Sequence, residues 1–223
     1  MVVHKILVHS VNLGGVDKPI EHAKQLVKAD YFTFTDENFP PRKNSLTLRL
    51  QAKIPKMFGW QLKPGYDYYL WLDGNIRLAH HESIQYFLDA VEDHDVAVLQ
   101  HPDRNTIWWE YRYNYRGLHS QAPSNYLTER YTNELLDEQM QVIKDDKDYV
   151  DDLLVNGGIF MYRNTPEIHK MLTEWWYYVS RYLIMDQMSW AYVLKTSGLR
   201  VNVLPDVFRD CMWLENIRHR RHG

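Results

Sequence analysis

The run Tyr68 to Leu72 (YYLWL) is continuously apolar or aromatic over the length of a β-strand. A half-exposed strand would alternate apolar and polar side chains, so this run predicts a strand buried on both faces at the centre of a sheet. Five other segments have strand-like composition: His4–Ser10, Tyr31–Phe34, Val96–Gln100, Leu153–Tyr162 and Val201–Leu204.

Helical patterns separate most of these strands. They cover Ile20–Lys28, Leu46–Met57, Glu82–Val91, Ser124–Met140, Pro166–Tyr182 and Met185–Thr196. We expect Pro55 to stop the second of them near Ile54, and periodicity does not decide the state of Trp108–His119. The alternation predicts an α/β, Rossmann-like fold with a mainly parallel central sheet flanked by helices, which binds ligands at the carboxyl ends of its strands.

Length and composition restrict the class of protein. With 223 residues, 45% of them hydrophobic, the expectation is one domain over residues 1–223 that ends in a basic His/Arg tail at 215–223. The 26 basic and 29 acidic residues are spread along the chain and give a net charge of -3, which argues against a partner that is a nucleic acid.

The same sequence predicts a cytoplasmic location without an integral membrane segment. Cys211 is the one cysteine and cannot form an internal disulfide, and the start MVVHKILVHS leads directly into a strand pattern. No apolar run approaches the roughly 20 residues that are needed to cross a bilayer.

The residues after the central strand predict a metal site. Asp73 and Asn75 offer two side-chain oxygens at a strand end, and Gly74 between them lets a ligand approach the backbone. Mg²⁺ and Mn²⁺ prefer such oxygen donors and need few of them when a diphosphate supplies others. A plain turn would use the same three residues.

Three further patterns are candidates for a site. Asn156, Gly157 and Gly158 interrupt a strand as if a ligand passed close by, although a β-bulge would look the same. Asp186 and Gln187 begin a helix, where an aspartate also serves as a cap. In the basic tail, His219 and His222 could each supply a metal ligand, while an unstructured tail is the alternative.

Four segments in one order carry a family resemblance: YYLWLDGNIRL, AVLQHPDR, LLVNGGIFMYR and IMDQMSWAYVL. Together with YFTFTDE and RLQAKIPK they resemble the GT-A-like glycosyltransferases of the domain-of-unknown-function 616 group, which includes plant alkaline-ceramidase-associated and mucilage-related proteins. The resemblance covers roughly Tyr31 to Asp206. It implies a GT-A fold, a nucleoside-diphosphate sugar donor, a glycan or other hydroxyl acceptor, and Mn²⁺ or Mg²⁺ as cofactor.

The resemblance also implies roles for single residues. Asp73 and Asn75 match the Asp-x-Asp motif that holds the metal, with an uncharged amide in place of the second carboxylate. Asp186 would face the reacting centre as general base in an inverting enzyme or as an acceptor-positioning carboxylate otherwise, with Asp152 as second candidate for the base. Asn156, Gly157, Gly158 and Gln187 would contact the sugar or acceptor, and His101 and Arg104 match a His-Pro-x-Arg segment on the acceptor and donor side, respectively.

Electrostatics completes the predicted donor site. A leaving diphosphate develops negative charge, which a metal and Lys or Arg donors stabilise in the transition state. Arg49 and Lys53 are the candidates for these cations. His9, within the predicted first strand, and Asn12, after it, are further candidates on the donor side.

Two other functions compete with glycosyl transfer. A phosphatase with an aspartyl nucleophile also begins from a strand that ends in Asp, but it needs a second acid where this chain has Asn75. A catalytically inactive nucleotide-sugar or carbohydrate-binding module is the stronger competitor, because the amide at Asn75 could have removed the metal and left the pocket. The sequence does not name the donor, the acceptor or the stereochemical outcome.

Overall fold

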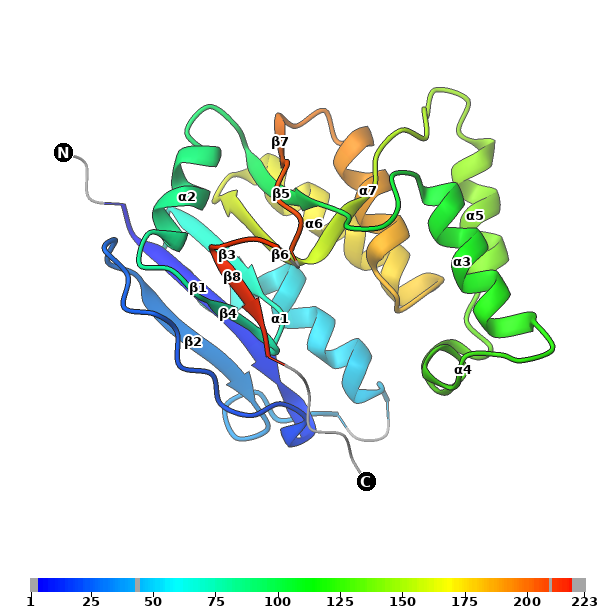
Figure 1. Ribbon diagram of the computed structural model, residues 1–223, viewed down its shortest axis with the longest axis horizontal. Helices are drawn as coiled ribbons and strands as arrows, with labels where there is room; N and C mark the ends of the chain where they lie inside the picture. The colour runs from blue at the N-terminus through cyan, green and yellow to red at the C-terminus, as the bar shows by residue number, and fades with distance from the viewer. Residues whose placement is uncertain (1–3, 43–44, 209, 218–223) are drawn as a thin grey trace.

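The computed structural model describes residues 4–42, 45–208 and 210–217. Its main sheet has the strand order β2-β1-β3-β6-β5-β7 (Figure 1). The strands are β1 (Ile6–Asn12), β2 (Asp30–Thr35), β3 (Tyr68–Leu72), β5 (Val96–Gln100), β6 (Val155–Arg163) and β7 (Val201–Leu204). β6 is antiparallel to its neighbours β3 and β5, and the other three pairings are parallel. The predicted α/β class with a mainly parallel sheet is confirmed.

Strand β3 is buried along its whole length, as its apolar run predicts. It pairs with β1 on one side and with β6 on the other, where the ring of Tyr69 stacks on that of Tyr162 at 5.2 Å. Trp71 enters the core on one face of the sheet, and Leu70 enters the core on the opposite face. A strand between two such cores has no place for a polar side chain.

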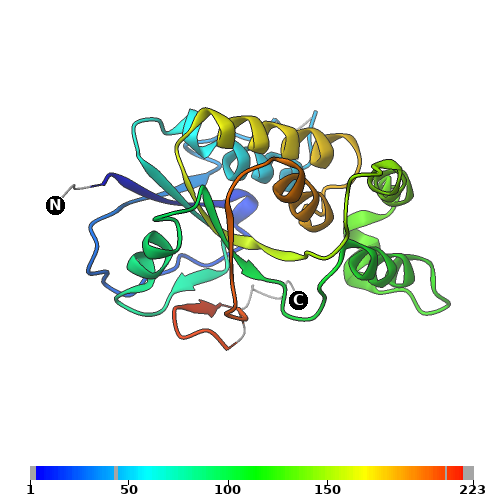
Figure 2. The ribbon, with the colours of Figure 1, turned by 90° about the horizontal axis from the view of Figure 1, so that it is seen from above.

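Helices cover both faces of the sheet (Figure 2). One face carries α1 (Leu48–Leu62), α6 (Pro166–Arg181) and α7 (Gln187–Thr196). The other carries α2 (Ser83–Ala90) and a two-stranded sheet of β4 (Ile76–Leu78) and β8 (Leu214–Asn216). A 3-10 turn, η1 (Leu13–Gly15), follows β1. The helices thus leave the carboxyl ends of β1 and β3 accessible at one edge.

Three helices form a group beyond α7, at the right of Figure 1: α3 (Ile107–His119), α4 (Asn125–Tyr131) and α5 (Leu136–Asp145). The side chains of Thr106 and Ser124 cap α3 and α4 by accepting backbone hydrogen bonds. The single helix predicted over Ser124–Met140 is wrong, because Asn133 adopts φ = 65° and separates α4 from α5.

Two other sequence predictions fail for tertiary reasons. Residues 20–28 are not helical, because their backbone bonds the end of β4 and the residues that follow it: the Ala23 amide donates to Leu78 O at 2.9 Å, and that of Leu26 to His81 O at 2.9 Å. Pro55 does not end α1, which continues to Leu62 with a kink at Phe58 (φ −120°).

No helix within the described ranges combines the length and apolar character required to cross a bilayer.

The contact between α1 and β1 gives a test of the fold. A Cβ at Gly59 would clash with the ring of His9, which is buried beneath it on β1. Gly59→Ala should therefore lower the free energy of unfolding by roughly 1–3 kcal/mol, although alanine is the better helix former. Denaturant titration measures this loss. In a His9→Ala background, Gly59→Ala should lower the free energy of unfolding by less than it does in wild type, because the His9 ring is no longer there to clash. An unchanged or raised stability of Gly59→Ala would contradict this packing.

Candidate donor and metal site

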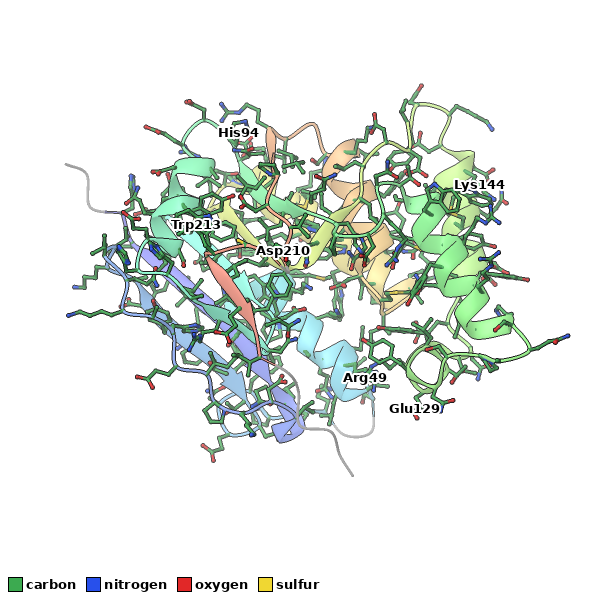
Figure 3. All side chains as sticks on the ribbon, in the orientation of Figure 1. Arg49, His94, Glu129, Lys144, Asp210 and Trp213 are labelled. Carbon is green, nitrogen blue, oxygen red and sulfur yellow. The ribbon has the colours of Figure 1, made fainter. Side chains whose placement is uncertain are left out.

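A cavity of ≈ 390 Å³ opens at the carboxyl ends of β1 and β3. Because these strands are parallel, the residues that follow them meet at one edge of the sheet. Its polar lining consists of Asn12, Asp17, Arg49, Lys53, Lys56, Asp73, Asn75, Arg130 and Tyr131. Figure 3 shows Arg49 at the amino-terminal end of α1, on the side of α4. The structure thus brings together Asn12, Arg49, Lys53, Asp73 and Asn75 of the residues predicted from sequence.

A larger hollow of ≈ 520 Å³ lies elsewhere, on the faces of β1 and β2 beneath residues 20–29. It contains no residue of the predicted site, and it lies away from the strand ends. Its chemistry is that of a surface groove with scattered lysines, whereas the smaller cavity holds converging carboxylate and cationic groups. The smaller cavity is therefore the candidate site.

Asp73 is held in place by hydrogen bonds on three sides. Its backbone amide donates to Gly158 O at 2.8 Å, and its backbone oxygen accepts from the Ile76 amide at 2.9 Å. The indole Nε1 of Trp71 donates to Oδ1 at 2.8 Å. The Asp73 side chain is nevertheless 43% exposed, so a fixed carboxylate faces the cavity.

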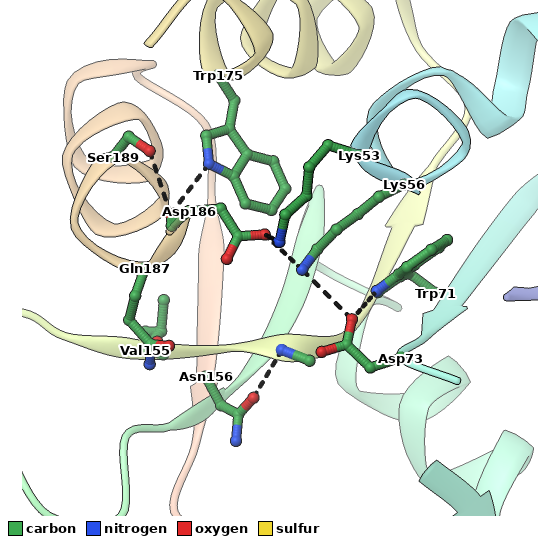
Figure 4. Close-up of polar contacts among 11 residues, drawn as sticks. Lys53, Lys56, Trp71, Asp73, Val155, Asn156, Trp175, Asp186, Gln187 and Ser189 are labelled. Carbon is green, nitrogen blue, oxygen red and sulfur yellow. Dashed lines mark hydrogen bonds and ion pairs between the residues drawn. The ribbon is translucent and has the colours of Figure 1, made fainter. Parts of the chain in front are cut away.

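Two lysines of α1 and one aspartate form the centre of the site (Figure 4). Lys53 and Lys56 are three residues apart, so both lie on one face of the helix. Their Nζ atoms lie 2.6 and 2.7 Å from Oδ2 of Asp186, the N-cap residue of α7. Nζ of Lys56 is also 3.4 Å from Oδ1 of Asp73. We call Lys53, Asp186, Lys56 and Asp73 the ion-pair chain.

The lysines determine the protonation state of Asp186. Its burial raises the pKa, but the charges and hydrogen bonds of Lys53 and Lys56 outweigh burial and lower the pKa to about 2. The carboxyl group is therefore ionised at neutral pH and is a weak base.

The described residues fit a divalent cation that binds together with phosphate. Asp73 supplies one carboxylate and Asn75 one amide carbonyl, and Mg²⁺ sites commonly use one or two carboxylates plus substrate phosphates. The Asn75 amide donates to Oδ1 of Asn216 at 3.0 Å, which leaves its carbonyl oxygen for a ligand. His219 and His222 lie outside the described residues, which end at Ile217, whose amide donates to Asn75 O at 2.7 Å.

The first residues of β6 lie beside this centre. A Cβ at Gly158 would lie 3.2 Å from Oδ2 of Asp73 and 3.0 Å from Oδ1 of Asn156, tighter than most Cβ contacts, so these side chains would have to shift slightly. A Cβ at Gly157 would reach Oδ1 of Asp186 at 3.6 Å, an ordinary contact. The Asn156 side chain accepts from the Gly158 amide at 2.7 Å, and that of Gln187 donates to Val155 O at 2.9 Å. The predicted Asn-Gly-Gly segment is thus adjacent to both aspartates of the ion-pair chain.

The comparison with known protein families agrees with this geometry. The profile of the TOD1/MUCI70, glycosyltransferase-like domain matches residues 43–222, most of the chain. The chain belongs to this family. The TOD1/MUCI70 match includes α1, the Asp73 turn, the first residues of β6 and Asp186, and it also includes the tail that contains His219 and His222. The comparison with curated proteins gave no match.

The fold of this TOD1/MUCI70 domain is similar to that of one solved structure, and two others align more loosely. The bifunctional glycosyltransferase WbbM in its apo form aligns with a TM-score of 0.50 and 12% identity, over 91% of this chain and 39% of that one. A glycosyltransferase involved in glycosylation of the major capsid of PBCV-1 aligns with a TM-score of 0.45 and 11% identity, over 90% and 82%. Mouse xyloside xylosyltransferase 1 aligns with a TM-score of 0.43 and 11% identity, over 91% of this chain and 85% of that one. The fold is GT-A-like.

Four predicted residues belong neither to the cavity lining nor to the group of residues beside the ion-pair chain. His9 is 1% exposed, and burial lowers its pKa to about 3, so it is a neutral core residue under α1. His101 accepts the Arg104 amide at 3.0 Å through Nδ1, and Arg104 pairs with Glu110 of α3. Asp152 pairs with Lys195 in the last turn of α7, the end opposite Asp186.

Sequence reasoning missed four residues that line the cavity: Asp17, Lys56, Arg130 and Tyr131. Lys56 had a signal, because it follows Lys53 by one helical turn and the helix continues through Pro55. Arg130 and Tyr131 had none, since α4 reaches the cavity only through the packing of the α3–α5 group.

The ion-pair chain predicts an acid-dependent stability. Asp186→Asn leaves two buried ammonium groups without their shared anion and should cost about 3–5 kcal/mol of unfolding free energy at neutral pH. Because the folded-state pKa of Asp186 is lowered to about 2, its stabilisation is complete above the unfolded pKa near ~4 and is lost as the pH falls through 2. The difference between wild type and Asp186→Asn should therefore shrink from pH 5 towards ~2.

Denaturant titrations at several pH values measure this difference. The exposed pair of Asp152 with Lys195 is the matched control, and Asp152→Asn should cost no more than about 1 kcal/mol. A cost for Asp186→Asn equal to that of the control, or independent of pH, would contradict the ion-pair chain.

Proposed function

We propose that this chain transfers a sugar from a nucleoside-diphosphate sugar to a hydroxyl group of a glycan or other acceptor, assisted by Mn²⁺ or Mg²⁺. One observation carries the proposal: a cavity at the strand ends combines the carboxylate of Asp73 with four cationic side chains, those of Arg49, Lys53, Lys56 and Arg130. Clustered cations together with the carboxylates of Asp73 and Asp17 suit a diphosphate bound with a metal ion.

The cationic side chains match the charge that develops in such a reaction. When the bond between the sugar and the diphosphate breaks, the leaving phosphate gains negative charge. Arg49 and Lys53 come from α1 and Arg130 from α4, so they approach the cavity from different sides. Positive groups that are fixed before the reaction stabilise this charge without reorganisation.

Asp73 and Asn75 would hold the divalent ion, with His219 or His222 as a further candidate ligand. When bound, the ion would neutralise charge on the diphosphate. Trp71 fixes the orientation of the Asp73 carboxylate through its indole hydrogen bond, and Lys56 binds the same oxygen. Oδ1 of Asp73 is thus occupied by contacts within the protein, and we assign Oδ2 to the divalent ion.

The beginning of β6 supports a position for the transferred sugar. A Cβ at Gly158 would crowd the Asp73 carboxylate, and Asn156 and Gly157 adjoin Gly158. A sugar ring at this place could approach the backbone closely. We assign Asn156, Gly157 and Gly158 to the sugar or acceptor, and Gln187, which ties α7 to β6, to keeping them in place. The roles of His101 and Arg104, which follow β5, stay predictions.

General-base catalysis by Asp186 finds little support in the geometry. A base near neutral pH works best with a pKa close to the operating pH, whereas that of Asp186 is about 2. Asp152 has the exposure for a base, but Lys195 holds it at the far end of α7. The proton acceptor and the stereochemical outcome are therefore left open.

An inactive binding module is the second candidate function. It is favoured by one observation, the amide of Asn75 that bonds Asn216 where a second metal-binding carboxylate would stand. Such a module would bind the donor without turning it over.

The one-domain organisation, the cytoplasmic location and the narrower likeness to the domain-of-unknown-function 616 group stay predictions.

Thermal unfolding with candidate ligands tests the donor site without knowledge of the acceptor. UDP, GDP, CDP and their common sugar conjugates are added to wild type and Asp73→Ala, with and without Mn²⁺. A ligand at about 100 times its dissociation constant adds roughly 2.7 kcal/mol and raises the midpoint by a few degrees. We expect one nucleotide to give a Mn²⁺-dependent shift that Asp73→Ala abolishes. If no nucleotide shifts the midpoint at saturating concentration, the nucleotide-sugar proposal fails.

A charge restored at the metal site tests the role of Asn75. Asn75→Asp adds a carboxylate beside Asp73, so half of the nucleotide-dependent shift should be reached at a lower Mn²⁺ concentration. The substitution also breaks the hydrogen bond to Asn216. Asn216→Ala removes that bond alone and should leave the Mn²⁺ dependence as in wild type. Equal Mn²⁺ dependence of Asn75→Asp and wild type would place the metal elsewhere.

A further inference from the structure

Lys56 is a buried cation at the junction of two carboxylates. Its side chain is 2% exposed, and Nζ lies 2.7 Å from Oδ2 of Asp186 and 3.4 Å from Oδ1 of Asp73. The rings of Trp71 and Trp175 lie 5.7 and 5.4 Å from the same nitrogen (Figure 4). Contacts on so many sides fix the ammonium group before any ligand arrives.

Asp186 lies behind the two lysines as seen from the cavity. Lys53 and Lys56 both line the cavity, whereas Asp186 does not. Its backbone oxygen accepts the Trp190 amide at 2.8 Å, Oγ of Ser189 at 3.1 Å and Nε1 of Trp175 at 3.2 Å. The aspartate is therefore held by α7 and α6, and a single oxygen, Oδ2, holds both ammonium groups.

We propose that Lys53 and Lys56 form a preorganised phosphate-binding pair, anchored by Asp186, that binds the donor's diphosphate even without a divalent ion. The inference rests on the proposed function and goes beyond it by assigning Lys56 and by making Asp186 a positioning residue. Two ammonium groups share one carboxylate behind them, so the side that faces the cavity remains positive. The 3.4 Å contact from Lys56 to Asp73 is the longest in the ion-pair chain and the first that a phosphate oxygen would replace.

This arrangement also accounts for the amide at Asn75. Asp73 and Asp17 are the carboxylates of the cavity lining, and a further carboxylate at position 75 would offset the positive charge of the lysine pair. The lysine pair supplies positive charge that a metal alone would otherwise bring. Nucleoside diphosphate binding should thus have a metal-independent part, carried by Lys53 and Lys56, and a part that Mn²⁺ adds.

Calorimetric titration in EDTA and in Mn²⁺ tests the pair. UDP, GDP and CDP are the probes, each compared with its nucleoside and with inorganic phosphate. We expect wild type to bind one nucleoside diphosphate in EDTA. Lys53→Met and Lys56→Met should each weaken that binding about tenfold or more while leaving nucleoside affinity unchanged, because each removes a charged hydrogen bond to phosphate.

Further variants separate positioning from packing. Asp186→Asn should weaken diphosphate binding in EDTA but not nucleoside binding, and Lys56→Arg should restore part of the loss seen in Lys56→Met. Lys147→Met removes an exposed lysine outside the cavity and should bind as wild type does. Should Lys56→Met fail to fold, Lys53→Met decides, since its side chain is 21% exposed and less of it is packed.

Three outcomes distinguish this inference from the proposed function. Wild-type binding in EDTA that Lys53→Met and Lys56→Met leave unchanged would overturn the lysine pair. Wild-type binding that occurs in Mn²⁺ but not in EDTA would also overturn the lysine pair. That result would still agree with the proposed donor site. Absence of nucleoside diphosphate binding under both conditions would overturn the proposed function together with the inference.

Discussion

The ion-pair chain from Lys53 through Asp186 and Lys56 to Asp73 joins three elements that are far apart in sequence: α1, the amino-terminal end of α7 and the turn after β3. Buried charges are tolerated only when each has a partner, so these elements must come together for the charges of Lys56 and Asp186 to be satisfied. The same requirement places two lysines and a carboxylate on the wall of one cavity. Stability and ligand chemistry therefore depend on the same contacts.

The direction of β6 explains why two separate motifs meet at this place. β6 is antiparallel to β3, with Leu72 opposite Ile159, so the first residues of β6 lie beside the last residue of β3. The Asn-Gly-Gly segment and Asp73 thereby become neighbours, and Gly158 O accepts the Asp73 amide. In an all-parallel sheet the beginning of β6 would lie at the opposite edge. One reversed strand thus brings the predicted sugar-binding residues to the predicted metal ligand.

Much of this arrangement could be predicted from the sequence. The unbroken apolar run of β3 and the strand-helix alternation predicted the sheet, because a strand buried on both faces is apolar along its whole length. Asn12 and Asp73 follow strands whose carboxyl ends lie at the cavity, and Arg49 and Lys53, predicted as cations for a diphosphate, line the same cavity. Lys56 was missed, because Pro55 was expected to end the helix. Residues 20–28 have a helical pattern, but their amides bond the end of β4 and the residues that follow it, and such distant partners leave no local signal.

Turnover of a nucleotide sugar tests the central claim most directly. Wild type and Asp73→Ala are incubated with UDP-, GDP- and CDP-sugars in Mn²⁺, and release of the nucleoside diphosphate is followed over time, first to water and then with hydroxyl acceptors. The account predicts release from one donor by wild type, faster with a suitable acceptor, and its loss in Asp73→Ala. Tight binding of a donor with no release to water or to any acceptor would contradict it and would identify the chain as a binding module.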